Sequence, residues 1–215
     1  MPARPAMSGT VYGVILNDIC TVQRMGQSLD DAPYKGAPKA PVLYIKPAGT
    51  RVPGGSMVSL PEGAAAVEVG ATVGLVMGQA AARLSVETAL EAVAGVVLAA
   101  DLSLPHASYY RPAVREKCFD GALPLGPVQP LSDLASLSLT TRIDGVVVEE
   151  RSLADLLRDP ARLLADVTGF MTLAEGDVLL VGVSYMAPQA VAGSRVSIDA
   201  GALGTLEFSI AGAQA

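Results

Sequence analysis

Residues 67–78 read VEVGATVGLVMG, and this stretch decides the class of fold. The run is apolar over almost its whole length and rich in valine, which predicts a long, buried β-strand. Gly70 and Gly74 interrupt it, and a glycine inside a strand marks a bend or the close approach of another backbone. We therefore expect a domain built around this strand.

Shorter strands are predicted on both sides of it. The strongest signal is a hairpin over residues 137–150, because Asp144-Gly145, a dipeptide that tight hairpin turns favour, joins two alternating runs. The remaining strands are expected at residues 10–16, 42–46, 56–60, 175–184, 194–199 and 204–210.

Helices are fewer in this interpretation. One is expected over residues 85–95, with Ser85 as its N-cap, and another begins at Asp159-Pro160, since Asp caps a helix and Pro suits its first turn. Residues 17–41 are interpreted as a polar loop. The predicted class is a β-rich α+β domain.

The length and charge of the chain restrict the number of domains and the kinds of partner that we expect. The 215 residues fit a single domain, which we divide into a tail, first strand and loop at 1–40 and a main domain at 41–212. The net charge is −6 and the basic residues are scattered, which argues against binding nucleic acid or a membrane surface. No apolar run reaches the roughly 18–20 residues of a membrane span, so we expect a cytoplasmic protein.

The cysteine and histidine content excludes another class of site. Cys20 and Cys118 lie far apart, which predicts neither a disulfide framework nor a Cys-x-x-Cys pair. His106 is the one histidine of the chain. Three or four nitrogen and sulfur ligands are needed for zinc, so a zinc site of that kind is not expected.

The reactive side chains gather in residues 98–121, LAADLSLPHASYYRPAVREKCFDG. His106 titrates near neutral pH and can act as a proton shuttle, although a histidine that follows proline in a polar segment is commonly just solvated. Arg111 and Arg115 can each clamp a carboxylate through two parallel hydrogen bonds. Tyr109 and Tyr110 can donate to an oxyanion or simply pack. We take this segment as one wall of a substrate pocket.

Several motifs in a fixed order carry a family resemblance. They are APVLYIKPAGTRVPGGSMVSLP, GATVGLVMG, AADLS, KCFDGALPLGP, MTLAEGDVLLVG and RVSIDAGALGTLEF, which together cover roughly residues 41–210. Each is weak alone, but their order is specific, and the chain resembles the fumarylacetoacetate hydrolase family. The resemblance implies a mixed β-roll with a few peripheral helices.

Within the family, residues 101–121 and the start of the chain are similar to the isomerase/decarboxylase branch of 4-hydroxyphenylacetate catabolism. This implies decarboxylation of 5-carboxymethyl-2-oxo-hex-3-ene-1,7-dioate and isomerisation of 2-hydroxyhepta-2,4-diene-1,7-dioate. It also implies a homodimer, or a heteromer with a homologous subunit. The alternative is a non-catalytic structural partner of a metal-binding homologue.

The resemblance also implies a metal site that this chain has largely lost. The family holds Mg²⁺ or a similar cation with a Glu-x-Glu pair and an Asp; here Gly70 and Thr72 occupy the two Glu positions, and Asp101 matches the third ligand. Glu68 would reach the site only through a shift of strand register. One carboxylate and one hydroxyl hold Mg²⁺ poorly, so metal binding should be weak or absent.

The lysine of the family's site corresponds to Lys117, which can stabilise developing negative charge if Asp101 keeps it protonated. The alternative is a surface lysine paired with Glu116 or Asp120. Lys46 is placed at the edge of the pocket, as a substrate-binding residue alongside Arg111, Arg115 and Tyr110.

Two departures from the family pattern bear on the reaction. Val181 and Val183 replace two threonines that bind a substrate carboxylate, and Ser184 and Tyr185 are the nearest substitutes. Residues 17–41 contain no histidine, whereas hydrolytic members use a His-Glu pair there to activate water. Decarboxylation and ketonisation need an electron sink and a proton donor rather than activated water, so hydrolysis is not expected.

Overall fold

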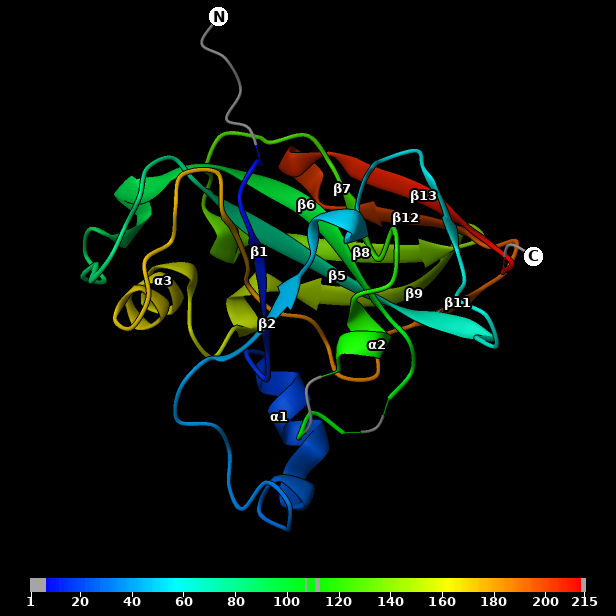
Figure 1. Cartoon of the computed structure of the whole chain (residues 1–215), viewed down its shortest axis with the longest axis horizontal. Helices are drawn as coiled ribbons and strands as arrows, with labels where there is room; N and C mark the ends of the chain where they lie inside the picture. The colour runs from blue at the N-terminus through cyan, green and yellow to red at the C-terminus, as the bar shows by residue number, and fades with distance from the viewer. Residues whose placement is uncertain (1–6, 107, 111–112, 214–215) are drawn as a thin grey trace, which may run out of the picture.

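Two β-sheets form the body of the protein in a computed structural model, which describes residues 7–106, 108–110 and 113–213 (Figure 1). The first sheet follows the order β2 (Val42–Lys46), β1 (Val11–Ile15), β10 (Val178–Leu180), β5 (Ala66–Met77), β6 (Val93–Ser103), β7 (Leu123–Leu125) and β3 (Arg51–Pro53), and β11 (Gln189–Val191) pairs with β5. The second follows the order β4 (Met57–Ser59), β13 (Thr205–Ala211), β12 (Arg195–Asp199), β8 (Ser138–Ile143) and β9 (Val146–Ser152).

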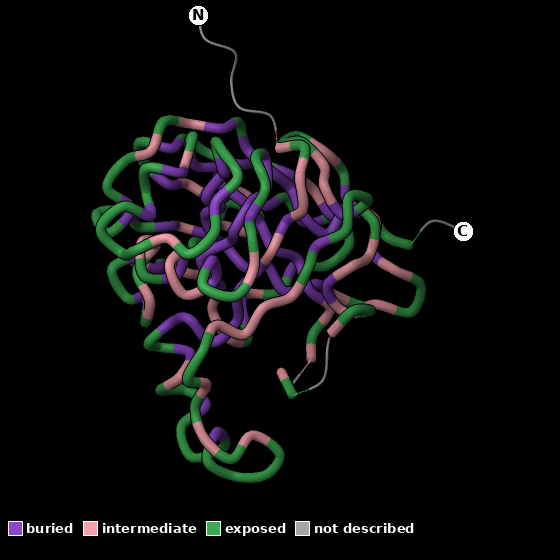
Figure 2. The backbone as a smooth tube through the Cα atoms, turned by 60° about the vertical axis from the view of Figure 1, so that its left-hand side comes forward, coloured by how far each residue is buried: buried purple, intermediate pink, exposed green. Residues whose placement is uncertain are grey.

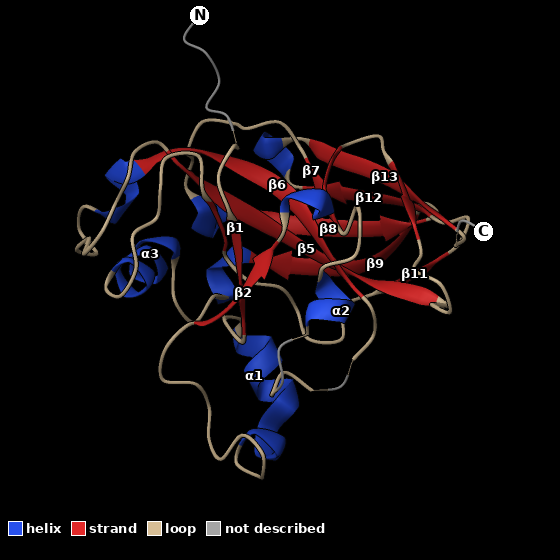
Figure 3. Ribbon diagram, in the orientation of Figure 1, coloured by secondary structure: helices blue, strands red, loops and turns tan. Residues whose placement is uncertain are grey.

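The helices lie around the outside of these sheets (Figure 3). They are α1 (Ile19–Met25), α2 (Val114–Lys117) and α3 (Pro160–Thr168), with 3₁₀ turns at Gly26–Leu29, Ala48–Thr50, Ala89–Ala92, Leu134–Ser136, Leu153–Asp155 and Gly201–Leu203. The start of α3 confirms the sequence prediction, because Asp159 caps the backbone N–H of Arg162 at 2.8 Å. Across the described residues, no helix has the length and apolar character needed to cross a membrane.

The hairpin prediction is confirmed and two helix predictions are wrong. Asp144 and Gly145 both have positive φ, 52° and 82°, as a tight two-residue turn requires. Residues 85–95 form only a short 3₁₀ turn, because the chain from Val93 onward pairs with β5. Conversely, α1 lies inside the segment expected to be a loop, and Asp18 caps it at the backbone N–H of Thr21.

The long strand β5 has both faces buried, so it separates two apolar clusters. Its odd-numbered residues, such as Val73 and Leu75, pack toward the second sheet in the main core. Val76, on the other face, joins a smaller cluster with Val97 and Leu180. Figure 2 shows this buried backbone at the centre of the molecule and a largely exposed extension in the lower part of the view.

The first sheet curls strongly about the face that holds the smaller cluster. Lys46 on β2 and Asp101 on β6 are separated by four strand spacings along the sheet, which would be about 19 Å in a flat sheet. Their side chains nevertheless meet, with Lys46 Nζ 2.6 Å from Asp101 Oδ1. The curl therefore brings residues from distant strands into one site, at the polar end of this face.

Candidate active site

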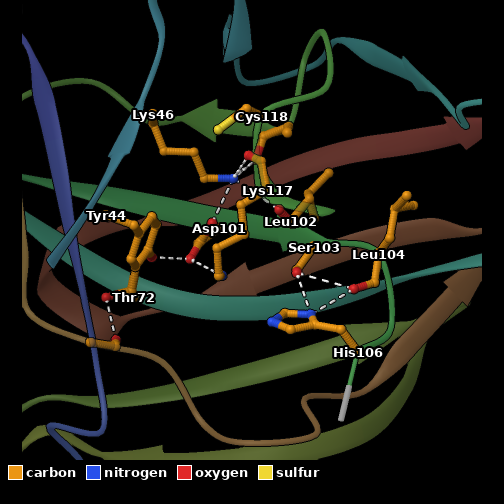
Figure 4. Close-up of polar contacts among 12 residues, drawn as sticks. Tyr44, Lys46, Thr72, Asp101, Leu102, Ser103, Leu104, His106, Lys117 and Cys118 are labelled. Atoms are coloured by element: carbon orange, nitrogen blue, oxygen red, sulfur yellow. Dashed lines mark hydrogen bonds and ion pairs between the residues drawn. The ribbon is translucent and has the colours of Figure 1, made fainter. Parts of the chain in front are cut away.

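Asp101 is the centre of a buried group of charges that we call the lysine–aspartate cluster: Lys46, Asp101 and Lys117 (Figure 4). Lys46 Nζ lies 2.6 Å from one carboxylate oxygen of Asp101, and Lys117 Nζ lies 2.9 Å from the other. The side chains of Lys46 and Asp101 are fully buried, and that of Lys117 is 6% exposed. The surface pairing of Lys117 that the sequence left open is therefore wrong.

Lys46 is held more tightly than a residue at a pocket's edge. Its ammonium group donates to the backbone carbonyls of Leu102, Lys117 and Ala122 at 2.6–3.0 Å, in addition to its ion pair with Asp101. These carbonyls come from the end of β6 and from the segment that joins α2 to β7. Lys46 thus binds the backbone of Lys117 itself, at the end of α2, and its ammonium group is enclosed by these contacts.

Tyr44 completes the cluster from β2. Gly13, its cross-strand partner on β1, has no side chain, and an added Cβ there would collide with the Tyr44 ring. The ring can therefore extend across the sheet, where its hydroxyl donates to Asp101 Oδ2 and its face lies 4.6 Å from Lys117 Nζ. Tyr44 was not among the predicted site residues, because no spacing along the chain reveals a contact made by the curl of the sheet.

The cluster carries more positive than negative charge. Burial acts to raise the pKa of Asp101, but Lys117 and Lys46 outweigh it and lower that pKa to about 2. Burial lowers the pKa of Lys46 to about 8, against the attraction of Asp101. At neutral pH there are two ammonium groups and one carboxylate, so the net charge is +1. A group of this charge is suited to hold an anion.

A cavity of about 520 Å³ lies in front of the cluster. Apolar side chains form most of its wall, and Lys117, Tyr44, Tyr109 and Tyr110 also line it. Asp101 and Lys46 are behind this wall. Lys117 is therefore the member of the cluster that an occupant of the cavity would touch.

Glu68 is a second carboxylate on the same face of the sheet. It lies on β5 opposite Ser103 of β6, two pairs along the register from Gly70 and Asp101, and is 8% exposed. Burial raises its pKa to about 7, and Lys117 opposes that rise. Among the described residues, its carboxylate makes no hydrogen bond, and with a pKa of about 7 it can exchange a proton near neutral pH.

His106 lies close to Ser103, which is the cross-strand partner of Glu68. Its Nδ1 lies 2.9 Å from the carbonyl oxygen of Leu104 and 3.3 Å from Ser103 Oγ. Its Nε2 is buried and has no hydrogen-bond partner among the described residues. The ring packs edge-on against Tyr109 rather than lining the cavity, so its predicted catalytic role stays a prediction.

The other predicted substrate residues are placed less centrally. Tyr110 lines the cavity and packs edge-on against Tyr34, and Arg115 is exposed on α2. Arg111 lies outside the described residues. Tyr185 packs against the ring of Tyr109, which places one of the two proposed substitutes for the missing threonines near the cavity wall.

The residues present do not fit the divalent cation that the family resemblance implies. Both oxygens of Asp101 face ammonium groups: Oδ2 accepts from Lys117, and Oδ1 lies 2.6 Å from Lys46 Nζ in an ion pair, although it accepts no hydrogen bond among the described residues. Thr72 Oγ1 donates to the carbonyl of Gly182 at 2.6 Å. A Cβ at Gly70 would come within 2.8 Å of Val183 Cγ1, so a glutamate there has no room. Within the described part of the chain, no three His, Cys, Asp or Glu side chains form a group that could hold a metal ion.

Comparison with known proteins agrees with this architecture. The family model for fumarylacetoacetate (FAA) hydrolase, C-terminal, matches residues 10–211. The chain belongs to the fumarylacetoacetate hydrolase family. It is 39% identical, over 94% of its length, to the 4-hydroxyphenylacetate degradation bifunctional isomerase/decarboxylase of Salmonella dublin, of which it covers 47%. It thus spans about half the length of the curated isomerase/decarboxylases that it matches.

Solved structures of this family share the fold. The 5-carboxymethyl-2-hydroxymuconate delta-isomerase of Mycobacterium smegmatis has a TM-score of 0.83 at 25% identity, over 99% of this chain and 82% of that one. Fumarylpyruvate hydrolase from Pseudomonas aeruginosa, in complex with Mn²⁺ and pyruvate, has a TM-score of 0.81 at 20% identity, over 98% of this chain and 97% of that one. The predicted β-rich roll is confirmed, and at least one member of the family binds a divalent metal.

Proposed function

We propose that this chain is a decarboxylase/isomerase unit that acts on an enolisable 2-oxo di- or tricarboxylate. The observation that carries the proposal is the lysine–aspartate cluster, which presents Lys117 and an excess positive charge to a cavity of about 520 Å³. The names of the isomerase/decarboxylase relatives and of the delta-isomerase support the same reaction class.

The proposed decarboxylation substrate is the one that the family resemblance implies, written above as a 1,7-dioate; because its main chain has six carbons, its terminal carboxylates are at positions 1 and 6, and its correct name is 5-carboxymethyl-2-oxohex-3-ene-1,6-dioate. The bond to the carboxylate next to the carboxymethyl branch breaks, and CO₂ leaves. The electron pair of that bond moves through the conjugated double bond onto the 2-oxo oxygen and forms a dienolate. Protonation of the dienolate on oxygen gives 2-hydroxyhepta-2,4-diene-1,7-dioate, and proton transfer from oxygen to carbon completes the isomerisation.

These steps require a group that stabilises negative charge on oxygen and a group that donates a proton to carbon, and the site contains candidates for both. Lys117, kept charged beside Asp101, stabilises the oxygen on which negative charge develops. The apolar cavity wall strengthens that interaction because it lowers the local dielectric constant. Two side chains near the cluster are candidates for the proton that reaches carbon: Glu68, whose pKa is about 7, and His106.

A second function is favoured by a specific observation. The family's two glutamate positions hold Gly70 and Thr72, and Val183 occupies the space beside Gly70. A subunit of this kind can serve as the structural partner of a homologous, metal-binding subunit in a heteromer. In the first proposal the chain works as a homodimer or beside such a homologue.

An assay of the purified chain separates these functions. Both substrates are supplied to the chain alone, to a homologue with the full ligand set alone, and to their mixture, and the loss of dienol absorbance and the release of CO₂ are followed. Turnover by the chain alone that falls in Lys117→Met, but not in the exposed control Lys39→Met, supports the enzyme. If the chain alone is inactive and only raises the activity of its homologue, the structural role holds.

A further inference from the structure

We propose that Lys117 takes the place of the family's divalent cation, so that this chain binds the oxo and carboxylate oxygens of a 2-oxo acid directly and without metal. The inference deepens the proposed function and rests on it. It follows from the disagreement between the side chains present and the donor set that a hard cation requires.

The first step is the occupation of Asp101. A carboxylate that binds a cation needs a free lone pair directed at it, whereas each oxygen of Asp101 has an ammonium group within 3 Å, Lys46 at 2.6 Å and Lys117 at 2.9 Å. Tyr44 donates to Oδ2 as well. A metal at this carboxylate would have to displace a lysine or lie close to one, and like charges at that separation repel strongly in a buried site.

The second step is the loss of space on β5. Gly70 lies directly opposite Asp101 in the strand register, and its missing Cβ leaves room for Val183 Cγ1 and for the backbone oxygen of Asp101. Thr72 has turned its hydroxyl to the carbonyl of Gly182. The wall that would supply two carboxylates is therefore packed closed by apolar and backbone atoms.

The third step is the position of the remaining positive charge. Lys46 is enclosed by three backbone carbonyls and Asp101, so it cannot reach the cavity. Among the described residues, Lys117 makes one ion pair, with Asp101, stands over the face of Tyr44 and lines the cavity. Its two further N–H donors can bind an oxo oxygen and a carboxylate oxygen together.

Binding of oxalate tests this inference independently of turnover, because oxalate has the two adjacent oxygens of a 2-oxo acid enolate. Titration calorimetry is run on the full chain in EDTA and again in excess Mg²⁺. We expect dissociation constants that agree within about twofold, and binding at least about tenfold weaker in Lys117→Met, with Lys39→Met unchanged. Oxalate binding that requires Mg²⁺, or no oxalate binding in either buffer, would overturn the inference.

A measurement on the unaltered chain covers the case in which Lys117→Met does not fold. The electron paramagnetic resonance signal of free Mn²⁺ is recorded with an equimolar amount of protein, with and without oxalate. Each signal should equal that of a blank with the same oxalate and no protein, since oxalate itself binds Mn²⁺; a further loss of free Mn²⁺ on adding protein contradicts the inference. A chain that binds oxalate without metal but turns over neither substrate would refute the proposed function and leave this inference intact.

Discussion

The protein buries two ion-pair systems, and their difference separates structural charge from functional charge. In the first, Arg151 of β9 lies 3.2 Å from Asp18 and donates to the carbonyls of Ala71 and Gly182. In the second, Asp101 is held between Lys46 and Lys117. Both systems join segments that are distant in sequence, so burial of charge alone does not identify a site.

What separates them is the charge balance and the nearby space. Arg151 and Asp18 cancel each other, and their side chains are 4% and 3% exposed. The lysine–aspartate cluster keeps one positive charge in excess, on a lysine that lines a large apolar cavity. We infer that the arginine pair stabilises the fold and that the lysine–aspartate cluster binds an anion. Variants of each should therefore fail in different ways.

The largest effect is expected on stability, from Arg151→Met. This change leaves the carboxylate of Asp18 buried without its partner and removes donors from two carbonyls, so unfolding should become easier by about 3–5 kcal/mol. Urea denaturation measures this, with the exposed Arg195→Met as the control. Equal stability of both variants would contradict the inference that the Arg151–Asp18 ion pair stabilises the fold.

Lys117→Met should give the opposite pattern. Asp101 keeps its ion pair with Lys46 and its hydrogen bond from Tyr44, so the urea midpoint should move little. Turnover should fall about 100- to 1,000-fold, since a charge aimed at the developing oxyanion is lost. The comparison fails if this variant loses stability as Arg151→Met does while the remaining folded protein keeps full turnover.

The titration of Glu68 predicts how the stability of the protein depends on pH. The pKa of Glu68 is about 7 in the folded protein, above its ordinary value of 4.5, so folding favours the protonated form. Its contribution to stability is complete below pH 4.5 and is lost as pH rises through 7. Glu68→Gln should therefore be more stable than the wild type at pH 8, by roughly 1–3 kcal/mol, and differ little at pH 4.5.

The same titration should affect anion binding. Above pH 7 the Glu68 carboxylate offsets the excess charge of Lys117, so oxalate affinity should fall between pH 6 and pH 8. Glu68→Gln should remove that decrease and keep the later one that follows deprotonation of Lys46 near pH 8. The titratable groups that interact with Glu68 are Lys117 and Tyr109. An identical pH profile in wild type and variant would assign the decrease to one of these.

The smallest effect is expected from His106→Asn. One ring nitrogen is bound to the backbone near Leu104, and the side chain does not line the cavity. Turnover should therefore stay within about tenfold of the wild type. A loss of 100-fold or more, the range of a true general acid, would make His106 rather than Glu68 the proton donor.

Much of the fold could be predicted from local patterns. The strand at 42–46, the Asp144-Gly145 hairpin and the start of α3 at Pro160 all follow from period, turn chemistry and capping. The helix expected at 85–95 shrinks to a 3₁₀ turn at Ala89–Ala92, although the run is rich in alanine, because the chain from Val93 onward pairs with β5. Long-range pairing overrode that propensity.

The site could be predicted only in part, for a related reason. Asp101 and Lys117 were chosen from family motifs, and the structure brings them together. Lys46 was placed at a pocket's edge, and Tyr44 was given no role, because their contacts with Asp101 depend on the curl of the sheet across four strand spacings. No periodicity along one strand contains that information.

The central claim is that an ammonium group, and not a metal, receives the 2-oxo acid in this chain. The most direct test is a crystal structure with oxalate and Mn²⁺, recorded with anomalous scattering at the manganese edge. We predict oxalate oxygens within about 3 Å of Lys117 Nζ and no anomalous peak beside Asp101. A manganese peak at coordination distance from the Asp101 carboxylate, with oxalate bound to it, would contradict the claim.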